Sequence, residues 1–322
     1  MIFTQTPQNG ASLYRPLIYA FGDEAAPRDL EIEVLDLDRR QKLATKRLYN
    51  TSSGMIEIAP VVRRTLNWQP EKTPLGFSAA TDRVAHVQVR VEGVSVARCF
   101  LPYVEESPQP LLFSTLPLKR LIARGEGEEL LLDRDVLYAE LERFTPKEST
   151  IETFYSDFTD QPALFRFTTA GMEPEVERLE LRLYSTTREV ILHYTLTNPI
   201  PGGMRVAWVG RGGSVEHYTF PIVERCSELQ ERDVAATAEG GCELLRGGYR
   251  RQWQLLSAYE TPERLKALVE LGTSPCIWIV SNLEGYLPVE VVAGERQILH
   301  QGLLTSLSFT LLEPLKEINP WS

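Results

Sequence analysis

The sequence predicts a mainly β fold, with two consecutive β-sandwich domains followed by a β-rich C-terminal domain that carries one short helix. Three observations predict this fold. Short runs of alternating apolar and polar residues follow one another through most of the chain, with turn signals between them. The length of 322 residues exceeds that of one ordinary sandwich domain. A clear helical signature occurs near residues 262–271.

The first predicted domain, residues 1–104, contains the cleanest strand pattern. In the run RVAHVQVRVEGVSVARCF, apolar residues at 85, 87, 89 and 91 alternate with polar ones, and Glu92-Gly93 supplies the tight turn of a hairpin. The earlier run LEIEVLDLD alternates in the same way until its phase breaks near Leu35, which predicts a bulge or a strand end. Strands of this spacing are typical of an immunoglobulin- or fibronectin-like sandwich.

The polar segment EESPQP, residues 105–110, predicts a linker. It opens the second predicted sandwich, residues 105–203, where Leu179, Leu181 and Leu183 alternate with charged residues. Prolines and glycines at 199–203 end this domain.

The C-terminal domain, residues 204–322, combines strand patterns with the helix. Thr261 is the expected N-cap, Pro262 takes the first helical position and Gly272 stops the helix. The apolar face of the helix is expected to comprise Leu265, Leu268, Val269 and Leu271.

Composition and charge exclude several classes of function. With 43% hydrophobic and 24% charged residues, the chain has the balance of a globular protein. The sequence contains no run long and apolar enough to predict a membrane span, and its start does not resemble a signal peptide. The net charge of −10 disfavours bulk nucleic-acid binding. We therefore expect a protein that is cytoplasmic on synthesis.

The four cysteines and four histidines are scattered, without the spacing of a metal site, so we expect no metal and no cofactor. Free thiols in a reducing compartment are the preferred interpretation. A disulfide between Cys226 and Cys242 across a hairpin is the less favoured alternative.

No motif predicts a catalytic residue. Gly212 and Gly213 are interpreted as a structural turn between two strands, in preference to an anion cradle, because no helix is expected to follow them. Glu216 and His217 are adjacent on a strand and point to opposite faces, so they cannot pair directly. The acidic cluster at residues 126–129 is expected to be solvated. A hydrolase that uses a carboxylate pair remains an alternative.

Aromatic residues offer the best sequence signal for binding. Trp68 and Trp321 lie beside prolines in polar stretches and are predicted to be exposed interaction residues. Trp208 and Trp278 lie inside apolar runs and are predicted to be core. An exposed tryptophan that stacks on a sugar would suit a carbohydrate-binding or adhesin-like protein, which is the alternative to an assembly protein.

Three passages together resemble tail-module structural proteins of Bacteroides-type phages and prophages: LYRPLIYAF, GMIEIAPVVRRTL and AWVGRGGSVEHYTF. The last is similar to a signature in which a tryptophan precedes a glycine pair and an aromatic strand. Here Gly210 stands where that signature has asparagine, and Glu216 or His217 stands where it has aspartate. The resemblance implies a non-enzymatic virion protein with fibronectin-like domains. Its implied partners are copies of itself and neighbouring tail-module proteins.

Overall fold

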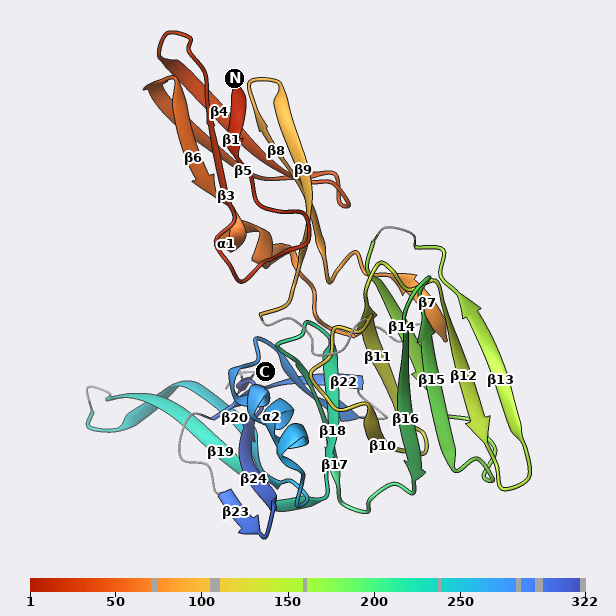
Figure 1. Ribbon diagram of the computed structural model, residues 1–322. Helices are drawn as coiled ribbons and strands as arrows, with labels where there is room; N and C mark the ends of the chain where they lie inside the picture. Colours follow the sequence, from red (N-terminus) through yellow and green to blue (C-terminus); the bar gives the residue numbers. More distant parts are fainter. Residues whose placement is uncertain are drawn as a thin grey trace.

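The computed structural model describes residues 1–70, 75–104, 111–158, 161–236, 239–281, 285–292 and 298–318. Within them the chain is mainly β and forms three units, which follow one another in colour order in Figure 1. The predicted fold class, two consecutive sandwiches followed by a β-rich unit with a short helix, is confirmed. Among these residues, none of the helices has the length and apolar character needed to cross a membrane.

The first unit is a sandwich of two sheets, with strand orders β1-β3-β6 and β2-β9-β8-β4-β5. Its elements are β1 (Ile2–Gln5), β2 (Ala11–Ser12), β3 (Ile18–Gly22), β4 (Arg28–Asp36), β5 (Gln41–Thr51), β6 (Ser53–Glu57), α1 (Ala59–Val62), a 3-10 turn (Arg63–Thr65), β8 (Ala85–Val91) and β9 (Val94–Leu101). Alternate residues of β4 and β8 point into one core that includes Tyr19 and Phe100.

Two local predictions in this unit are confirmed. Glu92 and Gly93 form the two-residue turn between β8 and β9, and both have positive φ, as a turn of type I′ requires. The pairing of β4 with β5 shifts register between Val34 and Leu35, which places a bulge where the sequence loses its phase.

The middle unit is a second sandwich, with strand orders β10-β16-β15-β12-β13 and β11-β14-β7. Its strands are β7 (Gly76–Ala79), β10 (Lys119–Ala123), β11 (Gly127–Leu132), β12 (Tyr138–Phe144), β13 (Ser149–Tyr155), β14 (Ala163–Thr168), β15 (Arg178–Tyr184) and β16 (Glu189–Thr197). Leu179, Leu181 and Leu183 are fully buried in its core. β7 falls within the residues predicted for the first domain, yet it pairs with β14. The chain therefore crosses into the middle unit and returns before β8.

The C-terminal unit is built on one large sheet, with the strand order β18-β17-β21-β22-β24-β20-β19. Its elements are β17 (Met204–Val209), β18 (Val215–Phe220), β19 (Ile222–Ala236), β20 (Cys242–Leu256), α2 (Pro262–Glu270), a 3-10 turn (Leu271–Thr273), β21 (Ile277–Ser281), β22 (Gly285–Val291), β23 (Ile298–Gln301), β24 (Leu304–Leu312) and β25 (Lys316–Ile318). Trp208 is fully buried and Trp278 is 5% exposed, which confirms both as core residues.

The predicted helix is present as α2, and it begins at Pro262 after Thr261. Leu268 and Leu271 pack into the core against the sheet, as expected. Val269 is 47% exposed, so its predicted place on the buried face is wrong. Consecutive helical residues differ by about 100° in direction, and a position next to Leu268 turns away from the sheet.

Candidate functional site

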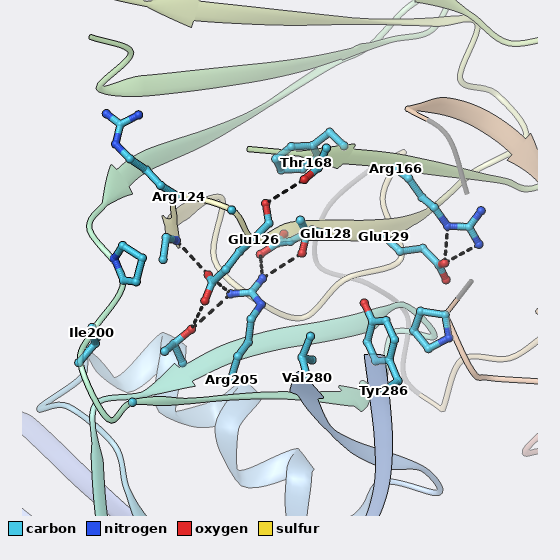
Figure 2. Close-up of a pocket in the computed structure, with 18 of the residues that line it drawn as sticks. Arg124, Glu126, Glu128, Glu129, Arg166, Thr168, Ile200, Arg205, Val280 and Tyr286 are labelled. Carbon is cyan, nitrogen blue, oxygen red and sulfur yellow. Dashed lines mark hydrogen bonds and ion pairs between the residues drawn. The ribbon is translucent and has the colours of Figure 1, made fainter. Parts of the chain in front are cut away.

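The middle and C-terminal units face each other across a cavity of about 490 Å3. Residues 123–129, in and before β11, form one wall, and Arg205, Thr219 and Tyr286 lie on the other. Figure 2 shows Arg205, on the C-terminal side of this space, directed at Glu126 and Glu128 on the opposite wall. A charge removed from water costs several kcal/mol unless it is paired, so the partners of each charged group determine what the site can do.

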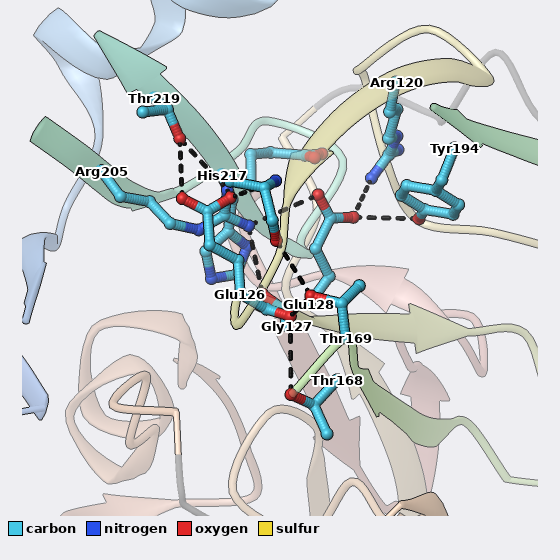
Figure 3. A network of polar contacts seen from close by, with 12 residues as sticks. Arg120, Glu126, Gly127, Glu128, Thr168, Thr169, Tyr194, Arg205, His217 and Thr219 are labelled. Carbon is cyan, nitrogen blue, oxygen red and sulfur yellow. Dashed lines mark hydrogen bonds and ion pairs between the residues drawn. The ribbon is translucent and has the colours of Figure 1, made fainter. Parts of the chain in front are cut away.

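Arg205 of β17 joins the two units (Figure 3). Its Nη1 donates to Glu126 Oε2 at 2.5 Å, and its Nη2 donates to the carbonyl oxygen of Gly127 at 3.1 Å. The same Nη2 lies 3.7 Å from Glu128 Oε1. Glu126 also accepts a hydrogen bond from Thr219 Oγ1 at 3.2 Å. The side chain of Arg205 is 7% exposed, so this contact between units is shielded from water.

A second buried arginine, Arg120, extends the network within the middle unit. Its Nη1 donates to Glu128 Oε2 at 2.9 Å, and Tyr194 donates to the same oxygen at 2.9 Å. Its Nη2 donates to Ser114 Oγ at 2.6 Å, and Ser114 Oγ donates to Glu216 Oε2 at 2.9 Å. Burial alone would lower the pKa of Arg120, but Tyr194, Glu128 and Glu216 outweigh it and hold the pKa above its ordinary value. Arg120 is therefore a fixed cation.

Glu216 and His217 of β18 have separate partners, as adjacent strand residues should. Glu216 Oε1 accepts the Thr115 N–H at 2.9 Å, and burial raises the pKa of Glu216 to about 7 although Arg120 opposes this shift. His217 Nε2 lies 3.2 Å from the hydroxyl of Tyr286. Burial, followed by the charges of Arg205 and Arg120, lowers the pKa of His217 well below its ordinary value. His217 is therefore neutral, and Glu216 titrates near neutrality.

Glu129 binds two arginines at the contact between the return segment from β7 and the middle sheet. Its Oε1 accepts from Arg83 Nη2 at 2.8 Å, and its Oε2 accepts from Arg166 Nε at 2.6 Å. The side chains of Glu129 and Arg83 are each 3% exposed. Arg83 comes shortly before β8, the strand with which the chain re-enters the first unit, so this ion pair connects the first unit to β11.

The expectation that the acidic cluster at residues 126–129 is solvated is wrong. Glu128 is 5% exposed and Glu129 is 3% exposed, because β11 lies at the contact between units and its outward side chains meet arginines. The sequence carries a signal for these arginines, since Arg166 and Arg205 each lie inside an apolar strand run. A charge in such a run is buried and needs a partner.

Glu126, Glu128 and Glu129 each accept a hydrogen bond from an arginine, so each carboxylate is already paired. A general base must present a free lone pair to a substrate proton, and these contacts direct the lone pairs at guanidinium groups. The arrangement suits a clamp between units. Among the residues described, no group of three or more His, Cys, Asp or Glu side chains could hold a metal ion.

Trp68 is 7% exposed, so its predicted exposure is wrong. It packs against Val209, Val215 and Trp278 of the C-terminal unit, beside Ala207. These partners are distant in sequence, and the polar residues and proline around Trp68 gave no sign of them. Trp321, the other predicted interaction residue, lies outside the described residues.

Gly212 and Gly213 lie in the connection between β17 and β18. Gly213 has φ +101°, and its N–H donates to the carbonyl oxygen of Gly210 at 3.0 Å. A Cβ on Gly212 would lie 3.0 Å from the carbonyl oxygen of Phe113, so the turn approaches the middle unit closely. The next residue, Ser214, donates its N–H to that same oxygen at 2.9 Å.

The cysteines lie apart along the chain's strands. Cys226 is exposed and free, and it lies opposite Trp253 in the β19–β20 hairpin, whereas Cys242 lies opposite Ala236. This register separates Cys226 and Cys242 along the hairpin, which rules out the disulfide alternative between them.

No protein-family model matches the sequence. A search of curated proteins finds no significant match. Solved structures with similar chain traces include extracellular domains 3–5 of Drosophila OTK, at 10% identity and a TM-score of 0.22, covering 78% of this chain and 91% of that one. An I-band fragment of titin matches at 10% identity and a TM-score of 0.19, covering 99% and 93%. Domains 4–9 of the surface layer protein SbsC match at 10% identity and a TM-score of 0.22, covering 98% and 47%. Values this low support no conclusion about function, and the two sandwiches are defined by their own strand pairing and cores.

Proposed function

We propose that this chain is a non-enzymatic structural protein that acts in assembly, and that it belongs to the tail module of a phage or prophage. The observation that carries the assembly role is the buried network centred on Arg205 and Glu129. It ties the middle unit to both of its neighbours through paired charges. A series of β units joined by buried ion pairs suits a scaffold that must hold its binding surfaces at fixed positions.

The tail-module assignment rests on the sequence resemblance of the three passages described above. Under this proposal the protein is made in the cytoplasm and becomes part of the virion. Its partners are copies of itself and the neighbouring tail-module proteins. It takes no cofactor and binds neither a membrane nor bulk nucleic acid.

The test combines sedimentation of the purified chain with co-purification of the proteins encoded beside its gene. We expect self-association or capture of a neighbouring tail protein, and mass spectrometry of purified particles should detect the chain. A strict monomer that captures none of its gene neighbours would overturn the proposal.

The alternative of a carbohydrate-binding protein rested on exposed tryptophans. Trp68 is buried against the C-terminal unit, so a glycan cannot stack on it without opening that contact. A glycan array that shows binding lost in Trp321→Ala, with the fold intact, would favour this alternative.

A further inference from the structure

The β19–β20 hairpin extends away from the C-terminal unit as an arm (Figure 1). Each of its strands has 15 residues, far more than the five or six of an average strand. β19 has no buried position, and Ile222, Leu229 and Val234 are 46%, 40% and 53% exposed. On its inner side β20 pairs with β24 over Gln252–Leu256 and with β25 over Gly247–Tyr249, so β19 is the exposed strand of this arm.

Among the residues that the structure describes, the outer edge of β19 also lacks a neighbour. In the described part of the chain β19 pairs with β20 alone and forms the end of the large sheet. An edge strand presents a row of N–H and C=O groups that another strand can pair with. An edge of this length is therefore a docking surface for an extended segment.

The charges along β19 identify that segment as a second copy of β19. The sequence from 224 to 232 reads ERCSELQER. If two copies pair antiparallel about Glu228, Arg225 lies opposite Glu231 of the other copy and Glu224 lies opposite Arg232. The two-fold axis repeats each pair, so four pairs of opposite charge form.

The neighbouring two-fold registers have less of this complementarity. Centring the pairing on Ser227 places Arg225 opposite Leu229 and Glu224 opposite Gln230, and centring it on Leu229 keeps only Arg225 opposite Asp233, repeated by the axis. The segment from Arg225 to Asp233 pairs with β20 without a register shift, so the Arg225–Glu231 pairs fall on a regular part of the edge, whereas Glu224 lies at the shift between Val223 and Arg225. Glu228 meets its own copy at the axis, but Arg251 lies opposite each Glu228 on β20 and offsets the repulsion.

We propose that two copies of this chain associate through antiparallel pairing of their β19 edges, centred on Glu228. This inference rests on the proposed assembly role and gives it a surface and a partner. In this register Cys226 lies opposite Gln230 of the other copy, and both residues are exposed.

The first test is a cross-link that reports the register. In Gln230→Cys, oxidation should join Cys226 of one copy to residue 230 of the other, because directly opposed antiparallel residues have Cα atoms about 4.5–5.5 Å apart. Leu229→Cys is the matched control, since residue 229 points to the other face. Covalent dimers in Gln230→Cys that are lost when Cys226→Ser is added support the proposal. Equal cross-linking in the two variants overturns it.

The second test reverses charges in the full-length protein. The acidic variant carries Arg225→Glu and Arg232→Glu, and the basic variant carries Glu224→Arg and Glu231→Arg. Each alone should dimerise at least roughly tenfold more weakly in sedimentation equilibrium, whereas an equimolar mixture should form a heterodimer in which all four pairs are again opposite. Circular dichroism checks that both variants are folded.

The outcomes separate this inference from the assembly role itself. A protein that self-associates equally well with either charge variant keeps its assembly role and overturns the β19 pairing. A wild-type chain that stays monomeric but captures a neighbouring tail protein also keeps its assembly role and overturns the β19 pairing.

Discussion

At the scale of single residues, the buried charges of β11 and the arginines that bind them are each paired with an opposite charge. Removing one partner of such a pair should lower the free energy of unfolding. Glu128, Glu129, Arg120 and Arg205 are all less than one-tenth exposed, and each binds an opposite charge. The sequence showed these residues as charges within or beside apolar runs, but it did not show which carboxylate meets which arginine. Those partners are up to about 80 residues apart along the chain.

Glu129 should be a sensitive carboxylate, because it accepts hydrogen bonds from two arginines. We expect Glu129→Gln to lower the free energy of unfolding by about 3 kcal/mol, since it removes the buried carboxylate that Arg83 and Arg166 share. Glu31→Gln, which removes an exposed ion pair with Arg47, is the control and should have little effect. Urea denaturation measures both, and equal losses would contradict the argument.

Glu216 should make stability depend on pH. The unfolded chain ionises this residue near its ordinary pKa of 4.5, but the folded protein retains the proton until about pH 7. The folded state therefore binds more protons between these values, and the free energy of unfolding falls as pH rises through this window, by roughly 3 kcal/mol in total.

Glu216→Gln cannot ionise and should lack this contribution. We expect the stability of the wild type relative to Glu216→Gln, measured by urea denaturation, to be greater at pH 5 than at pH 8. A difference that stays constant with pH would show that Glu216 is already ionised in the folded protein.

At the scale of elements, the sequence predicted those features that depend only on residues close together in the chain. The β8–β9 hairpin, the bulge at Leu35 and the start of α2 follow from turn residues, the phase of the alternation and the proline at the first helical position, and all three occur as predicted. The position of β7 in the middle sheet was not predictable, because a four-residue strand has the same alternation whichever sheet it joins.

The β17–β18 connection allows a test of backbone strain against crowding. Gly213 has φ +101°, and a Cβ there would lie 3.2 Å from Pro102 Cγ. Gly202 has φ +74°, and a Cβ there would meet nothing within 4 Å. We expect Gly202→Ala to cost about 1 kcal/mol from strain alone and Gly213→Ala to cost about 2 kcal/mol or more. Thermal melts of the two variants compare them, and equal costs would show that Pro102 moves aside freely.

At the scale of the whole molecule, the candidate site could not be predicted because it belongs to no single unit. Trp68 precedes the middle unit in sequence yet packs into the C-terminal unit, and Arg205 of the C-terminal unit binds Glu126 of the middle unit. Trp68 and Glu126 read as exposed or solvated when only their neighbours in sequence are considered, and the apolar run around Arg205 indicates its burial but not its partner. The fold of each sandwich is encoded locally, whereas the junction depends on how the units meet.

This junction should make the middle and C-terminal units unfold together. Arg205→Ala leaves Glu126 and Glu128 without the cation that joins the two units. We expect a loss of about 3 kcal/mol and, in differential scanning calorimetry, separation of one shared transition into two. Arg47→Ala removes an exposed arginine from its pair with Glu31, so it should keep the shared transition. If Arg205→Ala also unfolds in one transition with the melting temperature of Arg47→Ala, the packing around Trp68 is sufficient to couple the units without the buried ion pairs.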